Sequence, residues 1–560
     1  MRTELDRRMD DTIAGLTAAG GMLATGGVER WGTTLPMIAA APPSLPAYFA
    51  HYCTQHRDLE FLVAGEERLT FGAVYTAADR VARALVGRGI GRGDRVGIAA
   101  RNSPSWIVTY MAVLMAGGVA TLLNGWWQAE ELAAAIADVD CALIVADGPR
   151  AARLAQIPGL TTPVVAIDDT LPLDQATAPL LTGEAGDLPQ VGPDDLATIL
   201  FTSGSTGQSK GALSDHRAVI AGTFSFLSQA LTMLTISTQD GVAPPTQHVT
   251  LLTIPLFHVT AEVPVFLQSF AIGRRLVIIP KWDAREAMRL IERERVTYFI
   301  GVPLMSFEIL NHPDRGDYDL SSVSDFGAGG APRPVEHVRR IDAEMGGPAP
   351  LIGYGLTETN AVGTGNWRSN YIAKPDSCGR PSKPLVEVAI LDDAGTHLAQ
   401  GQRGEIGIRS IANFRGYWNR PAATEAAFTA DGFFRSGDIG YLDADGYLFI
   451  VDRKKDIIIR GGENISCQEV EAALYTHPAV KEAAVFGLAD ERLGEVPVAV
   501  VHLDADVGEE ALRTYLADHI AAFKVPTRIW IADAPLPRLG TEKIDKVGLK
   551  AAYRALAVAA

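Results

Sequence analysis

Apolar runs and amphipathic stretches alternate along most of the chain. Short apolar runs such as Arg95–Ala99 and Pro163–Ile167 have the length of buried strands, whereas the stretches between such runs have helical spacing. Strands that alternate with helices favour an α/β fold of mostly parallel sheets flanked by helices. The pattern predicts strands at Arg95–Ala99, Ala142–Ala146, Pro163–Ile167, Thr250–Ile254, Arg275–Ile279 and Thr297–Ile300, and helices at Thr76–Gly89, Ala129–Ala137 and Asp283–Glu294.

The segment Ile107–Leu123 carries no charged residue. It is about as long as the shortest membrane-spanning helices, but Gly117 and Gly118 interrupt it. We interpret it as a buried helix followed by a buried strand. We therefore expect no integral membrane segment.

The pattern changes after about Ser382. Short strands separated by turn signals predict a small antiparallel or barrel-like β unit over about 383–452, and a charged cluster at 452–456 follows. We expect a large N-terminal domain over 1–452 and a small, mobile α/β lid domain over 453–560, with the charged cluster as the hinge. The elements expected in this half are the strands Val386–Leu391, Gly404–Arg409, Tyr447–Val451, Val480–Phe486 and Val496–Leu503, and the helices Gln468–Tyr475 and Glu509–His519.

Composition narrows the class of protein. The chain has 560 residues, of which 47% are hydrophobic and 21% charged, as in an ordinary globular protein. The net charge of −16 argues against a partner such as nucleic acid, so an anionic ligand would need a local cationic site. The four cysteines are scattered and form no CxxC pair, which indicates neither a zinc ribbon nor a redox pair. Such cysteine usage fits a reducing compartment, and we expect a cytoplasmic protein.

A stretch rich in glycine and hydroxyl side chains, Thr202–Gly211, follows a strand expected at Ala197–Phe201. Small residues let backbone N–H groups approach phosphate oxygens, and Lys210 adds a positive charge. The stretch is not a Walker A loop, because no GK[ST] follows at the required spacing. The candidate nucleotide-binding residues are Thr202, Ser203, Gly204, Ser205, Thr206, Gly207 and Lys210, and Thr206 is also a candidate Mg²⁺ ligand.

This loop resembles the phosphate-binding loop of the adenylate-forming superfamily, which includes acyl- and aryl-CoA synthetases, amino-acid adenylation domains and luciferases. Further motifs of that superfamily follow in the same order, so the resemblance extends from about Leu45 to Lys550. It implies an enzyme whose substrates are a small carboxylic acid, ATP with Mg²⁺, and coenzyme A. The acid would attack the α-phosphorus of ATP, and CoA would then take the acyl group from the resulting acyl adenylate and release AMP.

The resemblance also implies roles for residues in the middle of the chain. His258, within Thr253–Thr260, would lie where the carboxylate pocket meets the pantetheine tunnel. Amino-acid-activating relatives have an aspartate at this position, so histidine argues against an amino-acid substrate. The adenine and acyl pockets would be lined by Gly330, Ala331 and Pro332.

The segment Tyr354–Glu358 resembles the adenylation signature of the superfamily. Tyr354 would stack on adenine and the Thr357 hydroxyl would donate to the α-phosphate. Glu358 would hold Mg²⁺, since a carboxylate suits an ion that prefers oxygen ligands.

Residues near the expected hinge complete the nucleotide site by resemblance. Asp438 would accept both ribose hydroxyls, and Arg453 would reach the ribose or a phosphate. Asp452 matches the hinge residue of the superfamily. Gly461 and Gly462 would let the backbone approach the pantetheine in the second half-reaction.

The C-terminal motif Pro537–Lys546 resembles the segment that carries the catalytic lysine. Lys543 would bridge the carboxylate and the α-phosphate, and Lys546 is a weaker alternative. Glu542 stands where the superfamily usually has glycine, and this acid could pair with Lys543. The catalytic candidates are thus Lys543, His258, Thr357 and Glu358.

We expect an AMP-forming acid–CoA ligase for a medium- or long-chain fatty acid, with an aryl or arylalkanoic acid as the alternative. Other classes compatible with the resemblance are an acyl-AMP ligase that loads a carrier protein, a luciferase-like oxygenase and a non-catalytic nucleotide binder. A homodimer is compatible with the sequence. We expect a deep acyl pocket next to Gly329, Gly330, Gly353, Gly363 and Gly365, with Phe257, Val259, Val263, Val265 and Phe266 lining or supporting it. The segment Asn124–Trp127 resembles one in fatty-acyl-CoA synthetases, and core packing explains its two tryptophans equally well.

Overall fold

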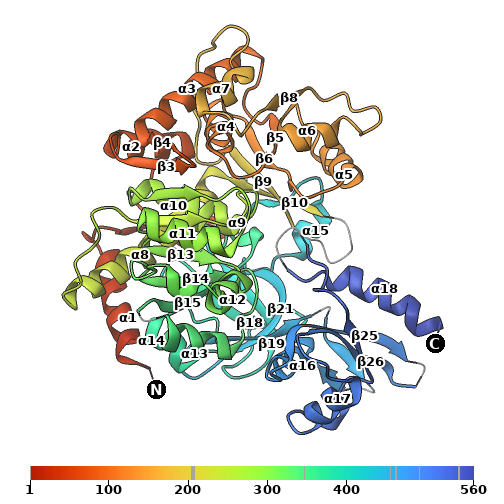
Figure 1. Cartoon of the computed structure of the whole chain (residues 1–560). Coiled ribbons are helices and arrows are strands. Elements are labelled where there is room, and N and C mark those ends of the chain that lie inside the picture. The colour runs from red at the N-terminus through yellow and green to blue at the C-terminus, as the bar shows by residue number, and fades with distance from the viewer. Residues whose placement is uncertain are drawn as a thin grey trace.

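The protein is described by a computed structural model that covers residues 2–202, 209–345, 347–454, 456–460, 463–490, 492–539 and 543–559. Two large sheets, both mostly parallel, form its body, with helices packed against them (Figure 1). This arrangement confirms the predicted α/β class. Its physical origin is the alternation of apolar strands with amphipathic helices, each of which buries one face against a sheet.

The larger sheet carries one wall of the functional site. Its central strands β15, β14, β13, β11, β12 and β3 are parallel, and strands at both edges are antiparallel. Over the described residues its order is β17 (Arg380–Pro381), β16 (Gly363–Trp367), β15 (Ala349–Gly355), β14 (Asp325–Gly329), β13 (Tyr298–Gly301), β11 (Val249–Leu252), β12 (Arg275–Ile278), β3 (Glu60–Ala64) and β4 (Glu67–Thr70).

The second sheet ends in an antiparallel hairpin that flanks the predicted phosphate loop. In the described part of the chain its order is β20 (Gly416–Tyr417), β10 (Lys210–Asp215), β9 (Leu196–Thr202), β6 (Val119–Leu122), β5 (Arg95–Ala99), β7 (Leu143–Asp147) and β8 (Val164–Ile167). Helices α3 (Phe71–Gly87), α4 (Pro104–Met115), α5 (Ala129–Val139) and α8 (His216–Gln239) accompany these sheets. Helix α3 begins before the predicted Thr76, because Thr70 caps its first turn.

The uncharged segment Ile107–Leu123 is the end of α4 followed by β6, as predicted. All residues of α4 are buried, so its uniform apolarity reflects burial within the protein. Among the described residues, α8 alone has the length and composition of a membrane-crossing helix, and 67% of its apolar window is buried.

A third sheet, β18 (Glu387–Leu391), β19 (Gly404–Arg409), β21 (Phe434–Leu442) and β22 (Leu448–Arg453), is antiparallel throughout. Its strands follow one another in an open order over the described residues, so the antiparallel part of the prediction is confirmed and the barrel-like part is wrong. The hairpin β21–β22 places Asp438 opposite Arg453.

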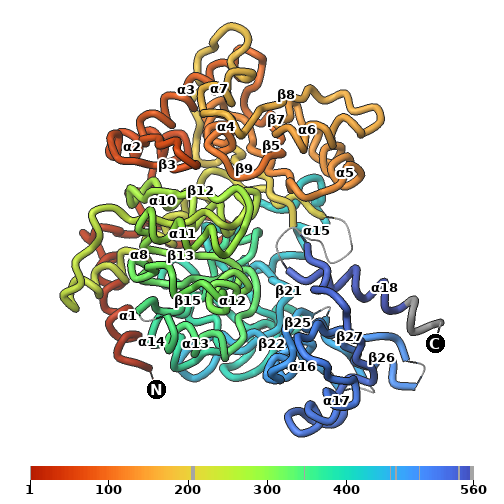
Figure 2. Tube along the Cα trace, in the orientation of Figure 1, coloured from red at the N-terminus to blue at the C-terminus, as the bar shows by residue number. Residues whose placement is uncertain are grey.

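The C-terminal elements build a fourth sheet with its own apolar core (Figure 1). Helix α18, which follows the catalytic-lysine motif, lies on the outer side of this unit (Figure 2). Its strands are β23 (Ile458–Arg460), β24 (Glu463–Ile465), β25 (Val480–Asp490), β26 (Gly494–Leu503) and β27 (Arg528–Ala532), and its helices are α16 (Cys467–Tyr475), α17 (Glu509–Ala517) and α18 (Lys546–Ala559).

The N-terminal segment folds onto the body in a way that the sequence pattern did not indicate. Helix α1 (Glu4–Thr17) packs against α8, and the hairpin β1 (Thr25–Arg30)–β2 (Thr33–Ile38) follows it. The buried carboxylate of Asp6 accepts hydrogen bonds from Tyr447 and Arg380. This polar anchor ties α1 to segments more than 370 residues away.

Candidate active site

The carboxyl ends of β14 and β15 meet the hairpin β21–β22 at one site. Tyr354, near the end of β15, donates its hydroxyl to Asp438 Oδ2 at 2.7 Å, and Arg453 Nε lies 3.3 Å from Asp438 Oδ1. Asp438 is 5% exposed, and burial raises the pKa of its carboxyl above the usual value, while Arg453 and Tyr354 oppose that shift. The structure thus brings together three of the residues predicted for the nucleoside.

Lys543 comes from the C-terminal unit and reaches into this site. Its carbonyl accepts a hydrogen bond from Leu539 N at 2.7 Å, and a bridge between Arg538 and Ile544 closes the hairpin that carries it. The nearest wall is Gly330 at the end of β14, where an added Cβ would stand 3.9 Å from Lys543 Cε. Gly330 has a φ of +74°, which also favours glycine.

Desolvation and charge act on Lys543 in the same direction. Burial and, to a smaller extent, the positive charge of Arg453 lower the pKa of its ammonium, Asp438 opposes the shift, and the resulting pKa is about 8. The unshifted value is 10.5, so Lys543 remains mostly cationic at neutral pH but sits close to its titration point. Lys546, the weaker alternative, instead pairs with Glu471 at 2.6 Å inside the C-terminal unit.

His258 lies close enough to Lys543 for the charge of that lysine to act on its imidazole. It precedes the short helix α9 (Val259–Ala261), and its Nε2 is buried without a hydrogen-bond partner among the described residues. Burial lowers the pKa of its imidazole to about 3, and the charge of Lys543 contributes to that shift. His258 is therefore neutral at physiological pH, and its free ring nitrogen can bond to a ligand.

Glu358 and Lys210 are linked by a residue that the sequence reasoning missed, Tyr417. The Tyr417 hydroxyl donates to Glu358 Oε1 at 2.8 Å, and Lys210 Nζ lies 4.9 Å from the centroid of the Tyr417 ring. Tyr417 belongs to β20, a two-residue strand that pairs with β10. Such a short strand leaves no periodic pattern, so only the pairing with Ala212 on β10 reveals its position.

Thr202 and Lys210 are paired across the hairpin β9–β10 and bracket the predicted phosphate loop. The predicted residues Ser203, Gly204, Ser205, Thr206, Gly207, Gly461 and Gly462, together with Glu542, lie outside the described residues. Thr357 begins a short 3₁₀ turn after β15, in sequence next to Glu358. Ala331 and Pro332 follow Gly330 directly in the sequence, but they are not among the residues that line the adjoining cavity.

Asp452, predicted at the hinge, is 1% exposed and anchors the start of the C-terminal unit. Its Oδ1 accepts from Arg453 N at 2.7 Å, and its Oδ2 accepts from Cys467 N at the first turn of α16. A carboxylate at a helix N-terminus is stabilised by the helix dipole and by unpaired N–H groups. The same residue therefore fixes the start of α16 and adjoins Arg453, the partner of Asp438.

A cavity of about 1160 Å³ extends from this site along the larger sheet. All five glycines predicted to keep the acyl pocket deep line it: Gly329, Gly330, Gly353, Gly363 and Gly365. Of the two roles predicted for Phe257, Val259, Val263, Val265 and Phe266, lining the pocket is wrong, because all five pack into the core. Thr260, Pro264 and Gln268, spaced four residues apart, line the cavity instead.

The structure also tests the interpretation of Trp126 and Trp127. Neither Trp126 nor Trp127 lines the cavity. Trp127 packs against Phe201 with ring centroids 5.1 Å apart, and Arg150 covers the Trp126 ring. Core packing is therefore confirmed for Trp127, which packs against a core cluster, and is wrong for Trp126, which is 46% exposed.

Of the two predicted Mg²⁺ ligands, Glu358 lies in the described part of the chain and Thr206 does not. Burial raises the pKa of Glu358, so a bound cation would favour its charged form. No cluster of three or more His, Cys, Asp or Glu able to hold a metal occurs in the described residues. Mg²⁺ at Glu358 would therefore depend on phosphate oxygens and water for most of its ligands, as this ion usually does.

Comparison with known proteins agrees with this geometry. The model of the AMP-binding enzyme family matches residues 49–418, and that of the AMP-binding enzyme C-terminal domain matches residues 469–543. The chain therefore belongs to the AMP-binding enzyme family, which confirms the resemblance to adenylate-forming enzymes.

Individual relatives point to one reaction class. The chain is 33% identical over 491 residues to the long-chain-fatty-acid–CoA ligase FadD13 of Mycobacterium tuberculosis, covering 87% of this chain and 94% of that protein. It is 34% identical to a feruloyl-CoA synthase of Amycolatopsis, covering 86% and 93%. The ATP-bound structure of MatB from Rhodopseudomonas palustris matches with a TM-score of 0.78 at 29% identity, covering 92% and 99%.

The fold, the site and these relatives define an AMP-forming acid–CoA ligase. ATP and CoA are its substrates together with a carboxylic acid, and the reaction passes through an acyl adenylate. The luciferase-like and carrier-loading alternatives lose their support, because the relatives above are acid–CoA ligases.

The lowered pKa of Lys543 predicts the pH dependence of adenylate formation. The ammonium form neutralises phosphate charge, so kcat/KM for MgATP should fall as pH rises through about 8, the pKa of the free enzyme. Lys543→Arg should remove this alkaline limb, because a guanidinium stays protonated. Pyrophosphate release between pH 6 and 10 measures both profiles, and an identical limb in the two proteins would contradict the assignment.

Tyr417→Phe should lower kcat/KM for MgATP roughly tenfold, the cost of about one hydrogen bond to a charged group. The aromatic ring next to Lys210 remains in this variant. The decrease in kcat/KM therefore reports only the hydrogen bond from the hydroxyl to Glu358. Tyr441→Phe, on β21 against Phe449, is a matched control and should leave kcat/KM unchanged. Equal activity of Tyr417→Phe and the native enzyme would show that Glu358 needs no such orientation.

Proposed function

We propose that this ligase activates a medium- or long-chain fatty acid. The observation that carries the proposal is the cavity of about 1160 Å³, which begins at Gly330 beside Lys543 and extends along the sheet. It is larger than most sites for small ligands. Its lining includes Met22 and Val242, which are 72% and 60% exposed, so it reaches the surface and leaves room for a long chain. Relatives named as long-chain and medium-chain acyl-CoA ligases support this class of acid.

The first half-reaction brings an anion to a polyanion, so charge neutralisation is its main demand. We propose that Lys210 and Lys543 supply the positive charges, one on each side of the triphosphate. Asp438 binds the ribose hydroxyls and Tyr354 presents its ring to the adenine. Glu358 holds Mg²⁺, which neutralises phosphate charge when bound.

We propose that His258 lies at the carboxylate of the acid. Its imidazole is uncharged, and its buried Nε2 lacks a partner among the described residues and is therefore open to a ligand. Thr357 lies next to Glu358 and provides a hydroxyl for the α-phosphate. Ala331 and Pro332 border the adenine, and Thr202 with the glycine- and serine-rich loop cradles the phosphates.

We infer a domain boundary between residues 452 and 453, with the C-terminal unit as a lid. In the arrangement described, the lid presents Lys543 to the site, as adenylate formation requires. Rotation about Asp452 and Arg453 would withdraw Lys543 and bring Gly461 and Gly462 to the pantetheine for the second half-reaction. The separate apolar core of the C-terminal unit supports its movement as one body. We further place the protein in the cytoplasm, and a homodimer is compatible with this account.

An aryl or arylalkanoic acid is the second candidate. The feruloyl-CoA synthase relative and a matching structure of o-succinylbenzoate CoA synthetase support it. Both candidates need a cavity that extends far beyond the reacting carboxylate.

Mass spectrometry of acyl-CoA distinguishes the candidates. The enzyme receives MgATP, CoA and a panel of fatty, aryl and amino acids, with a parallel series lacking CoA. We expect acyl-CoA and AMP from acids of eight or more carbons, by roughly tenfold or more over amino acids of similar size. Preferred use of aryl acids would favour the second candidate, and acyl adenylate that accumulates equally with and without CoA would contradict CoA as acceptor.

Lys543→Ala should lower adenylate formation roughly 10²–10³-fold, the scale of losing one preorganised charge stabiliser. It should largely spare thioester formation from supplied acyl adenylate, because the lid would turn Lys543 away in that step. Lys550→Ala, an exposed lysine on α18, is the matched control. Stopped assays measure the rate of each half-reaction. An equal loss of both rates would contradict a lid that presents Lys543 only for adenylate formation.

A further inference from the structure

The far part of the cavity lies at the opposite edge of the sheet from the chemistry. Gly329 and Gly330, at the carboxyl end of β14, border Lys543, whereas Asp325 begins the same strand and also lines the cavity. Four residues of extended strand span about 13 Å. His248, Arg274 and Thr297 each directly precede or border the amino ends of neighbouring strands and line the same far part.

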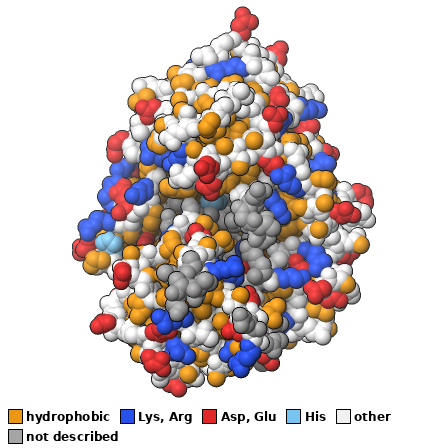
Figure 3. Space-filling view, turned by 90° about the vertical axis from the view of Figure 1, so that its right-hand side faces the viewer, with side chains coloured by type: hydrophobic (Ala, Val, Ile, Leu, Met, Phe, Trp, Pro, Cys, Tyr) orange, Lys and Arg blue, Asp and Glu red, His pale blue; other side chains and the backbone are white. Residues whose placement is uncertain are grey.

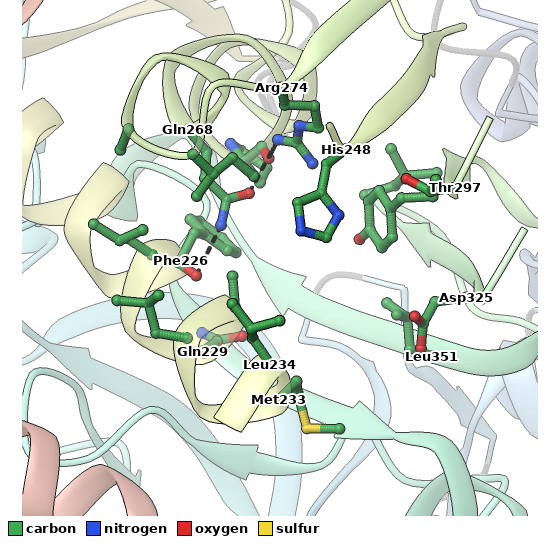
Figure 4. A pocket seen from close by; sticks show the side chains of 18 of the residues that line it. Phe226, Gln229, Met233, Leu234, His248, Gln268, Arg274, Thr297, Asp325 and Leu351 are labelled. Atoms are coloured by element: carbon green, nitrogen blue, oxygen red, sulfur yellow. Dashed lines mark hydrogen bonds between the residues drawn. The ribbon is translucent and has the colours of Figure 1, made fainter. Parts of the chain in front are cut away.

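Arg274 is the unusual member of this lining. It is 3% exposed, yet it borders the cavity, and Figure 4 shows its guanidinium projecting toward His248 and the open space. Its Nε donates to Ser269 Oγ at 2.9 Å, and its Nη2 donates to the carbonyls of Pro264 and Val265, each at 3.0 Å, and to Gln268 Oε1 at 3.1 Å. Its Nη1 makes no hydrogen bond to the residues that the structure describes.

The contacts of Arg274 serve partly to support the fold. Pro264 and Val265 belong to a π-helical segment, Glu262–Leu267, and their carbonyls accept hydrogen bonds from Arg274. The Val265 carbonyl also accepts a hydrogen bond from Ser269 Oγ at 2.6 Å. Nη2 donates to both carbonyls, so this half of the guanidinium has a structural role. A neutral donor could do the same, so capping alone does not account for a buried positive charge.

The charge of Arg274 has no carboxylate partner within the described residues. Asp325, the acid of this lining, is held by Arg368 through hydrogen bonds of 2.9 and 3.1 Å. Burial lowers the pKa of Arg274 to about 10, so it is still charged at neutral pH. Burial and the nearby Arg274 lower the pKa of His248, which keeps that imidazole neutral. The far part of the cavity therefore carries a net positive charge.

Neutral groups around Arg274 are oriented to complete a polar site. Gln268 donates its Nε2 to the carbonyl of Phe226 at 2.9 Å, which turns its Oε1 toward Arg274 (Figure 4). A buried charge without a counter-ion is costly, and a ligand that supplies an oxygen acceptor removes that cost. The methyl end of an ordinary alkyl chain cannot supply one.

We propose that the far end of the cavity binds a second oxygen acceptor of the substrate, a carboxylate or carbonyl group remote from the carboxylate that is activated. The inference rests on the proposed function, since it names the class of acid that enters the same cavity. Arg274 Nη1 is the donor, with His248 beside it. The span of about 13 Å corresponds to roughly ten carbon–carbon bonds in zigzag, so the two oxygen groups are separated by a chain or ring system of about that length.

Matched pairs of acids test this proposal on the native enzyme. Each α,ω-dicarboxylic acid of eight to sixteen carbons is compared with the methyl-terminated acid of the same length, and an ω-oxo acid forms a third arm. Acyl-CoA formation gives kcat/KM for each. We expect the dicarboxylic or oxo acid of about twelve carbons to exceed its methyl-terminated partner roughly 10–100-fold.

Two variants assign the preference to Arg274. Arg274→Met should reduce the ratio of kcat/KM for bifunctional over methyl-terminated acids roughly 10²-fold, because the second carboxylate would be buried without its partner. Gln268→Glu places a carboxylate beside Arg274 in a side chain of the same size, and it should also abolish the preference. Arg275→Met changes the neighbouring arginine, which pairs with Glu60 and does not line the cavity, and should preserve the ratio.

The outcomes separate this inference from the proposed function. Equal or better use of methyl-terminated acids at every length would overturn the second acceptor site while leaving acid–CoA ligation intact. Acyl-CoA from none of the acids would instead contradict the proposed function. If Arg274→Met fails to fold, the kcat/KM ratio of the native enzyme and that of Gln268→Glu still test the proposal. A preference for bifunctional acids that is unchanged in Gln268→Glu would show that Arg274 does not bind the second oxygen group.

Discussion

The buried carboxylate of Asp438 is the interaction on which the site depends. It receives the hydroxyl of Tyr354 from the larger sheet and the guanidinium of Arg453 from the next strand, and its charge opposes the loss of the proton from Lys543. Three separate parts of the chain are therefore held around one anion. Burying a charge is costly and such partners offset the cost, so the same constraint that organises the site also keeps its parts together. On the face that carries this site, acidic and basic side chains are interspersed around a hollow (Figure 3), so cationic attraction for ATP comes from within the site.

The larger sheet then sets the geometry of the substrate. Its parallel strands place the reacting groups at one edge and the polar lining around Arg274 at the other, with small glycines leaving space between them. Ligands in open α/β sheets bind beyond the carboxyl ends of strands, which is where the proposed nucleotide site lies. The extension toward the amino ends gives this cavity a second, electrostatically distinct end.

Much of this arrangement could be predicted from the sequence. Apolar periodicity located most central strands, and the glycines at the end of β14 and β15 correctly indicated a deep pocket. Which of these residues line the cavity could not be predicted, because in the π-helical segment Glu262–Leu267 it is Pro264 that lines the cavity, whereas Val263 and Phe266 pack into the core. Contacts such as Tyr417 with Glu358 and Asp6 with Tyr447 join residues 59 and 441 positions apart, and neither leaves a local pattern.

The most direct test of the account is the pKa of Lys543 itself. Competitive labelling of lysine amines across pH, read residue by residue with mass spectrometry, should give about 8 for Lys543 in the native enzyme. Asp438→Asn should lower the value further, because the carboxylate that favours the ammonium is gone. A value near 10.5 in both proteins would mean that Lys543 is solvated and remote from Asp438, and would contradict the account.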